Sequence, residues 1–151
     1  MSLEDLYREV ILDHYRNPRN KGHLEDPDVK AEGVNPLCGD ELTIELNFED
    51  ERVSAVAIDG QGCSISQSSA SMMTEAIKGK TRSEIESLTQ QFRDMMSLDG
   101  ETEIELDPDR PGAVLGDLES LQGVRKYPVR IKCASLGWNV LLEALDEAPL
   151  T

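Results

Sequence analysis

Three cysteines in three unlike settings are the feature that most constrains how this chain of 151 residues can fold. Cys38 lies in a segment bounded by proline and glycine, Cys63 follows a predicted strand, and Cys133 falls within the last predicted helix. An odd number of cysteines cannot close into a disulfide framework, so a hydrophobic core has to stabilise the fold. Three thiolates and the carboxylate of Asp40 would make a full tetrahedral ligand set for a soft divalent metal.

Alternating and helical patterns predict both strands and helices. Apolar residues recur at helical spacing from Leu3 to His14, and Asn17-Pro18 predicts the end of that helix. Residues 42–48 and 53–58 alternate between apolar and polar side chains, which predicts two antiparallel strands joined by a turn. The sequence Asp59-Gly60-Gln61-Gly62 predicts that the second strand stops there.

The second half of the chain is predicted to be mostly helical. Helices are expected over 64–79, from 81 towards 98, over 115–121, and from Pro128 onward, with an acidic loop at 99–112. We therefore expect one domain, residues 1–151, of the α+β class, with a small antiparallel sheet covered by helices.

The charge of the chain excludes some classes of function. Thirty acidic residues against fifteen basic ones give a net charge of −15. Such a surface repels phosphate backbones, and few aromatic side chains are available for base stacking, so we expect no nucleic-acid partner. No apolar run approaches membrane-spanning length, and the N-terminal residues resemble no targeting peptide. With free thiols, this predicts a reducing, cytoplasmic location and no membrane partner.

Each candidate ligand also has a purely structural interpretation. Asp40 could be a turn residue that begins a strand. Cys63 could be a small buried hydrophobe, although the start of a helix favours an anionic thiolate and the nearby glycines allow close backbone approach. Cys133 could belong to the core, because it lies on the apolar stripe of its helix. His14 and His23 are interpreted as packing or surface residues.

A basic cluster precedes the third cysteine in an otherwise acidic chain. Its members are Arg125, Lys126, Arg130 and Lys132, with no acidic residue among them. It could be a solvated helix start. We favour a docking face, or a positive field that stabilises a thiolate.

Three segments of the chain resemble the cysteine segments of the IscU-like iron–sulfur assembly family, which includes the NifU N-terminal domains. They are Asn-Pro-Leu-Cys-Gly-Asp at 35–40, Gly-Gln-Gly-Cys-Ser-Ile-Ser-Gln-Ser-Ser at 60–69, and Arg-Ile-Lys-Cys-Ala at 130–134. Lys132 stands where IscU proper has histidine, and Lys126-Tyr127-Pro128-Val129-Arg130 replaces its chaperone-binding segment. Together with the long acidic stretch before them, these departures match the SufU branch of the family.

The resemblance implies a fold of the IscU type and a zinc site whose ligands are Cys38, Asp40, Cys63 and Cys133. It implies that Cys38 accepts persulfide sulfur from a SufS-type cysteine desulfurase and passes it to downstream iron–sulfur assembly proteins. Two alternatives remain open at this stage: a scaffold on which a [2Fe–2S] cluster is assembled, and a structural zinc domain that only binds partners.

Overall fold

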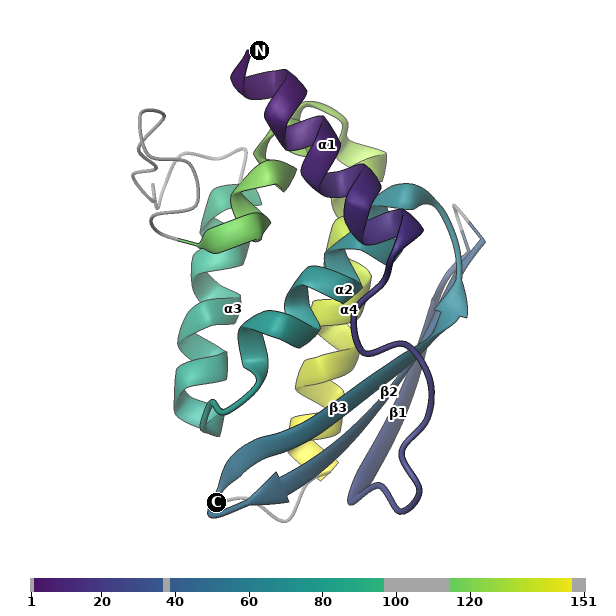
Figure 1. Ribbon diagram of the computed structural model, residues 1–151, viewed down its shortest axis with the longest axis vertical. Helices are drawn as coiled ribbons and strands as arrows, with labels where there is room; N and C mark the ends of the chain where they lie inside the picture. The colour runs from purple at the N-terminus through teal and green to yellow at the C-terminus, as the bar shows by residue number, and fades with distance from the viewer. Residues whose placement is uncertain (1, 37–38, 97–114, 148–151) are drawn as a thin grey trace.

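Three antiparallel strands in the order β1-β2-β3 form the sheet on which the helices pack (Figure 1). A computed structural model describes residues 2–36, 39–96 and 115–147. In chain order the elements are α1 (Leu3–Arg16), β1 (Val29–Asn35), β2 (Asp40–Glu49), β3 (Arg52–Gln61), α2 (Ser64–Ile77), α3 (Arg82–Met96), the 3₁₀ helix η1 (Gly116–Lys126) and α4 (Pro128–Glu147). The predicted α+β class is confirmed.

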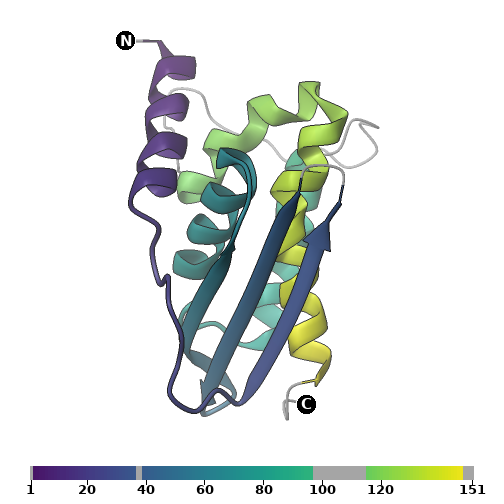
Figure 2. The ribbon, with the colours of Figure 1, turned by 90° about the vertical axis from the view of Figure 1, so that its right-hand side faces the viewer.

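The helices gather on one face of the sheet, and the other face is open (Figure 2). Helix α4 packs against β1 and β2, and α2 packs against β3 and α4. The apolar residues Leu42, Ile44 and Leu46 alternate along β2 and are buried. On the far side of α4, Trp138 stacks on Phe92 of α3 with ring centroids 4.8 Å apart. The core therefore lies between the sheet and the helical layer.

Strand β1 was missed by the sequence patterns. It pairs with β2 over its whole length, from Val29 opposite Leu46 to Asn35 opposite Asp40. Its inward positions include the small residues Ala31 and Gly33, which give a weak alternating signal. The small size is required because a Cβ at Gly33 would collide with the side chain of Val140 on α4.

The predicted end of β3 at Asp59 is wrong. The strand continues through Gly60 to Gln61, which pairs with Glu41 of β2. Gly60 has φ +147°, and a Cβ there would collide with the Glu41 carbonyl. Only glycine can pass so close to the neighbouring backbone, so here the residue continues the strand rather than breaking it.

Most local signals at the element ends are confirmed. Ser2 and Asp5 form the capping box of α1, and Thr81 and Glu84 form a reciprocal pair at the start of α3. Pro128 is the first residue of α4. The helix predicted at 115–121 is instead a 3₁₀ helix that runs on to Lys126. The predicted acidic loop at 99–112 lies outside the described residues, among which no helix is long and apolar enough to cross a membrane.

Two histidines attach the N-terminal segment to the rest of the fold. His14 on α1 is 2% exposed, and its ring nitrogens lie 2.8 Å from Ser71 Oγ on α2 and 2.9 Å from an Asp117 oxygen on η1. His23 lies on the open face of the sheet, with its ring nitrogens 3.1 Å from carboxylate oxygens of Glu45 and Asp59. His14 is buried and His23 is exposed, and neither belongs to the group of possible metal ligands found among the described residues.

The His23 contacts predict a pH dependence of stability. The hydrogen bond to Glu45 raises the pKa of His23 above its ordinary value, against the opposing effect of burial. The stabilisation is therefore complete below the unfolded histidine pKa of about 6.5 and is lost as the pH rises through the folded value. His23→Gln should lower the melting temperature at pH 6 more than at pH 9. If the melting temperature falls equally at both pH values, a charged His23 does not stabilise the fold through Glu45 and Asp59.

Candidate metal centre

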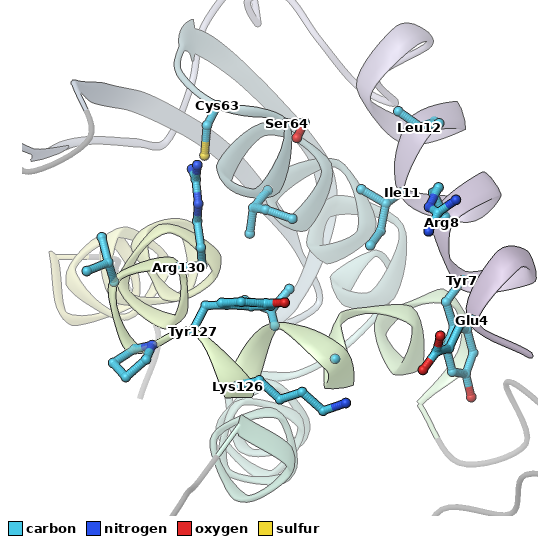
Figure 3. A pocket seen from close by; sticks show the side chains of 15 residues that line it. Glu4, Tyr7, Arg8, Ile11, Leu12, Cys63, Ser64, Lys126, Tyr127 and Arg130 are labelled. Atoms are coloured by element: carbon cyan, nitrogen blue, oxygen red, sulfur yellow. The ribbon is translucent and has the colours of Figure 1, made fainter.

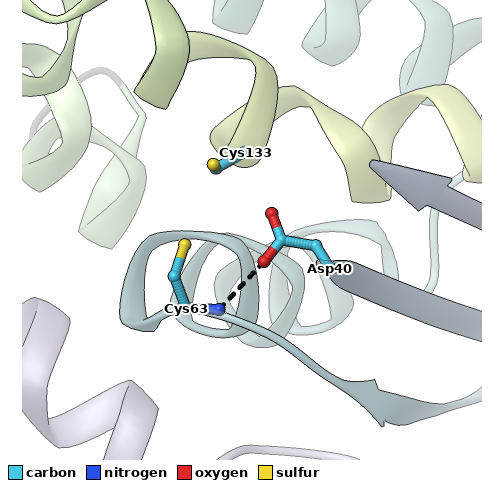
Figure 4. Close-up of side chains that lie close together, drawn as sticks. All are labelled: Asp40, Cys63 and Cys133. Carbon is cyan, nitrogen blue, oxygen red and sulfur yellow. Dashed lines mark hydrogen bonds between the residues drawn. The ribbon is translucent and has the colours of Figure 1, made fainter. Parts of the chain in front are cut away.

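Asp40, Cys63 and Cys133 meet at one end of the sheet although they are far apart in the sequence (Figure 4). Asp40 begins β2, Cys63 immediately precedes α2, and Cys133 lies in the second turn of α4. One ligand atom from each lies within 4.8 Å of the other two. The predicted ligand Cys38 lies outside the described residues.

The carboxylate of Asp40 is buried and only half satisfied. Asp40 is 1% exposed, and its Oδ1 accepts a hydrogen bond of 2.9 Å from the backbone N–H of Cys63. Oδ2 is buried with no hydrogen-bond partner among the described residues. A buried carboxylate oxygen without a partner is costly, so this atom is suited to coordinate a cation. Asp40 thus does more than begin a strand.

Cys63 occupies the N-cap of α2, a position that serine, threonine or aspartate usually fills. Its sulfur accepts from the backbone N–H of Ser66 at 3.5 Å. The N-terminal end of the helix dipole also favours negative charge there. Cys63 is half-buried, so its sulfur lies at the edge of the site and is not enclosed in the core.

Cys133 is brought to the site by a close crossing of α2 and α4. The hydroxyl of Ser69 on α2 donates a 2.6 Å hydrogen bond to the carbonyl of Ala134, the residue after Cys133. At Gly137, one turn further along α4, a Cβ would lie 3.5 Å from Ala70. The hydrogen bond and the packing of Gly137 against Ala70 hold Cys133 opposite the start of α2.

Arg130 is the positive group of the site. Its side chain extends from the first turn of α4 toward the sulfur of Cys63 (Figure 3). The negative charge of Cys63 raises the pKa of Arg130 above its ordinary value, with a further contribution from hydrogen bonding to Cys133. Arg130 was predicted as part of the basic cluster, and its position supports the interpretation that the cluster stabilises thiolates.

A groove of about 930 Å³ opens beside the site (Figure 3). Helix α1 forms one wall, the junction of η1 and α4 forms the other, and Cys63 lies at its end. Tyr127 and Val129 line it and are 63% and 54% exposed. Lys126 of the basic cluster lines it too, whereas the side chain of Arg125 lies outside the described part. The groove thus combines exposed apolar surface with positive charge.

The donor set fits zinc. Two cysteine sulfurs and a carboxylate are ligands that zinc accepts, and one more ligand would complete four-coordination. Zinc bonds of about 2.0 to 2.3 Å in a tetrahedron place ligand atoms roughly 3.5 to 3.8 Å apart, so a small contraction would close the three described ligands on a metal. A carboxylate is unusual in a purely structural zinc site, which argues against a site that serves folding alone.

One residue at the site was not predicted from the sequence. The side-chain amide of Asn35 donates to the sulfur of Cys133 at 3.7 Å. Asn35 belongs to the first cysteine segment, and strand β1, which the sequence patterns did not predict, places it at the site. If β1 is recognised as a strand, the pairing of Asn35 with Asp40 in the hairpin is the signal that places Asn35 near the site.

Comparison with known proteins places this chain in a family. Residues 6–134 match the family described as the NifU-like N terminal domain. The chain is 46% identical over 140 residues to the zinc-dependent sulfurtransferase SufU of Bacillus subtilis, covering 93% of this chain and 89% of that protein. It is 36% identical to the iron–sulfur cluster assembly scaffold protein IscU of Streptococcus pyogenes, covering 97% of this chain and 86% of that one.

A solved structure shares the fold. It is described as a candidate iron–sulfur cluster assembly scaffold protein for the SUF system, FiSufU, from Fervidobacterium islandicum AW-1. Its TM-score is 0.80 at 34% identity, over 91% of this chain and 94% of that one.

Gly62 offers a direct test of how tightly the centre is built. A Cβ there would lie 2.6 Å from Ser66 Oγ and would collide with the Asp40 carboxylate. Gly62→Ala should therefore displace Asp40 and lower zinc affinity about 10-fold or more in a chelator competition. Gly123→Ala is the matched control, since nothing lies within 4 Å of a Cβ at that position. Equal affinities of the two variants would show that Asp40 is not held as described.

Proposed function

The chain belongs to the NifU-like N terminal domain family, and on that premise we propose that it is a zinc-dependent sulfur-transfer protein of iron–sulfur cluster assembly. Its sulfur donor would be a SufS-type cysteine desulfurase, and Cys38 would be the acceptor. The observation that carries the proposal is the cluster of Asp40, Cys63 and Cys133, in which one buried carboxylate oxygen has no partner among the described residues. Similarity to the zinc-dependent sulfurtransferase SufU supports it.

The residues that would hold the zinc are Cys38, Asp40, Cys63 and Cys133. When bound, zinc would keep the cysteine sulfurs as thiolates near neutral pH. Cys63 and Cys133 are fixed at or within helices, which suits them to stay in place throughout the reaction. In the sequence Cys38 lies between Pro36 and Gly39, residue types that are typical of loops, which would suit it to meet a partner.

The transfer itself is an exchange between sulfurs. The thiolate of Cys38 attacks the outer sulfur of the desulfurase persulfide, and a new sulfur–sulfur bond forms on Cys38. The bond within the donor persulfide breaks, and the electron pair leaves with the desulfurase thiolate. No net oxidation or reduction occurs, because one persulfide is consumed and one is made. Arg130, beside Cys63 and Cys133, would supply positive charge next to the site where the exchange takes place.

A second candidate function is assembly of a [2Fe–2S] cluster on the same ligands. It is favoured by the identity to the IscU scaffold protein of Streptococcus pyogenes. Thiolates and a carboxylate can also bind iron, and the carboxylate would make the cluster labile. Against it, position 132, directly before Cys133, holds an exposed lysine that cannot serve as a neutral nitrogen ligand in the way histidine does.

The groove beside Cys63 would receive the desulfurase. Tyr127 and Val129 offer apolar area, while Lys126 and Arg130 supply positive charge on a chain whose net charge is −15. Exposed apolar residues rimmed by charge are typical of protein–protein interaction sites. The complementary surface on the desulfurase would be acidic, and long-range attraction would speed the encounter.

Mass spectrometry tests the sulfur acceptor. After incubation with desulfurase and cysteine, the wild-type chain should gain one sulfur on the peptide that contains Cys38. Cys38→Ser should gain none there and should no longer stimulate the desulfurase. Ser135, two residues after Cys133 on α4, provides a control, since Ser135→Ala should behave as wild type. A sulfur found on Cys133 in the wild type would contradict the assignment of Cys38.

Charge reversal tests the docking surface. Lys126→Glu should slow association with the desulfurase several-fold at low salt and reduce its salt dependence, because it removes attraction during the encounter. Lys30→Glu makes the same change on β1, away from the groove, and should have a smaller effect. Stopped-flow association at two salt concentrations measures both. Equal slowing by the two variants would show that overall charge, not the groove, is responsible.

A further inference from the structure

Asn35 lies opposite Asp40 at the end of the β1–β2 hairpin, and it is 7% exposed. The two side chains reach the site from adjacent strands. The Asp40 carboxylate meets the backbone of Cys63, while Nδ2 of Asn35 lies 3.7 Å from the sulfur of Cys133. A single strand pairing thus places a potential ligand and an amide donor at the same centre.

Cys133 makes two contacts, one that needs its thiol proton and one that does not. As a thiol, Cys133 donates to the carbonyl of Val129 at 3.7 Å. A thiolate has no proton to donate, so that contact cannot persist in a metal-bound cysteine. The contact with Asn35 runs the other way, with the amide N–H as donor, and becomes stronger when the sulfur is charged.

We propose that Asn35 is a positioning residue of the metal centre, whose amide N–H orients the Cys133 thiolate and draws electron density from its sulfur. The proposal rests on the metal site described under the proposed function. Hydrogen bonds to ligating sulfurs tune the properties of metal–thiolate sites, and partners of this kind also fix the direction of the ligand.

The role assigned to Asn35 separates Cys133 from the sulfur acceptor. An N–H donor makes a thiolate a poorer nucleophile, because its charge is already partly compensated. Cys133 is further confined by its position in α4, where it is fully buried. Cys63 has a comparable donor, the backbone N–H of Ser66. The donors on Cys63 and Cys133 would keep both sulfurs as ligands while sulfur is accepted elsewhere.

Cobalt substitution isolates the effect of the amide from sulfur-transfer activity. Asn35→Leu keeps a side chain of similar size and removes the donor, and Asn35→Asp keeps the shape and replaces the amide with a carboxylate. The matched control is Asn47→Asp, the same exchange on β2, where Asn47 Oδ1 accepts from Asp28 N–H and an oxygen remains available. Far-UV circular dichroism of the metal-free variants establishes that they fold.

The Cys-to-cobalt charge-transfer band should move to longer wavelength in Asn35→Leu, because the sulfur becomes richer in electrons. Chelator competition should show an affinity about 10- to 100-fold lower for Asn35→Leu and Asn35→Asp than for wild type. The control Asn47→Asp should match wild type in both. A folded Asn35→Leu variant with an unchanged band and affinity would overturn the role of Asn35. A wild-type chain that binds no cobalt would overturn the metal site itself, and the role of Asn35 with it.

Discussion

The close crossing of α2 and α4 is the constraint on which the rest of the site depends. The hydrogen bond from Ser69 to the Ala134 carbonyl and the packing of Gly137 against Ala70 hold the two helices against each other. Because Cys63 caps α2 and Cys133 lies in the second turn of α4, this approach brings two sulfurs together that are 70 residues apart in the chain. The buried serines at the start of α2 therefore pack against neighbouring elements, and this packing positions the two cysteines.

The sheet adds the third described ligand and ties it to the helices. Asp40 uses one oxygen to accept from the backbone at the start of α2, and its other oxygen is buried without a partner among the described residues. Leaving such an atom unpaired costs roughly 1 to 3 kcal/mol. A bound cation would remove this cost, so metal binding and stability of the folded chain are coupled. Asp40 therefore joins the sheet to the start of α2 and, in the proposed site, also binds the metal.

Much of this was predictable from sequence, and what was missed has physical reasons. The capping residues of α1 and α3 and the strong alternation in 42–48 are local signals, so they were found correctly. Strand β1 was missed because contact with α4 demands small residues there, and Gly60 was misread because its close approach to Glu41 depends on a neighbouring strand.

The candidate site shows the same division. The resemblance named Asp40, Cys63 and Cys133, and the structure brings these three together. The spacing of the cysteines could not show that they meet, because the helix crossing that unites them is a tertiary contact. For the same reason the amide of Asn35 could not be found from local pattern, since its contact with Cys133 joins residues 98 positions apart.

We propose that Cys38, Asp40, Cys63 and Cys133 hold a single zinc ion used for sulfur transfer. A helix start, an arginine and an amide surround the sulfurs of Cys63 and Cys133. Elemental analysis of the freshly purified chain, combined with its absorption spectrum, tests whether the chain carries zinc. We expect one zinc per chain and no absorbance in the visible range. A brown protein that contains iron and inorganic sulfide in equal amounts, without zinc, would contradict it and would favour a cluster scaffold.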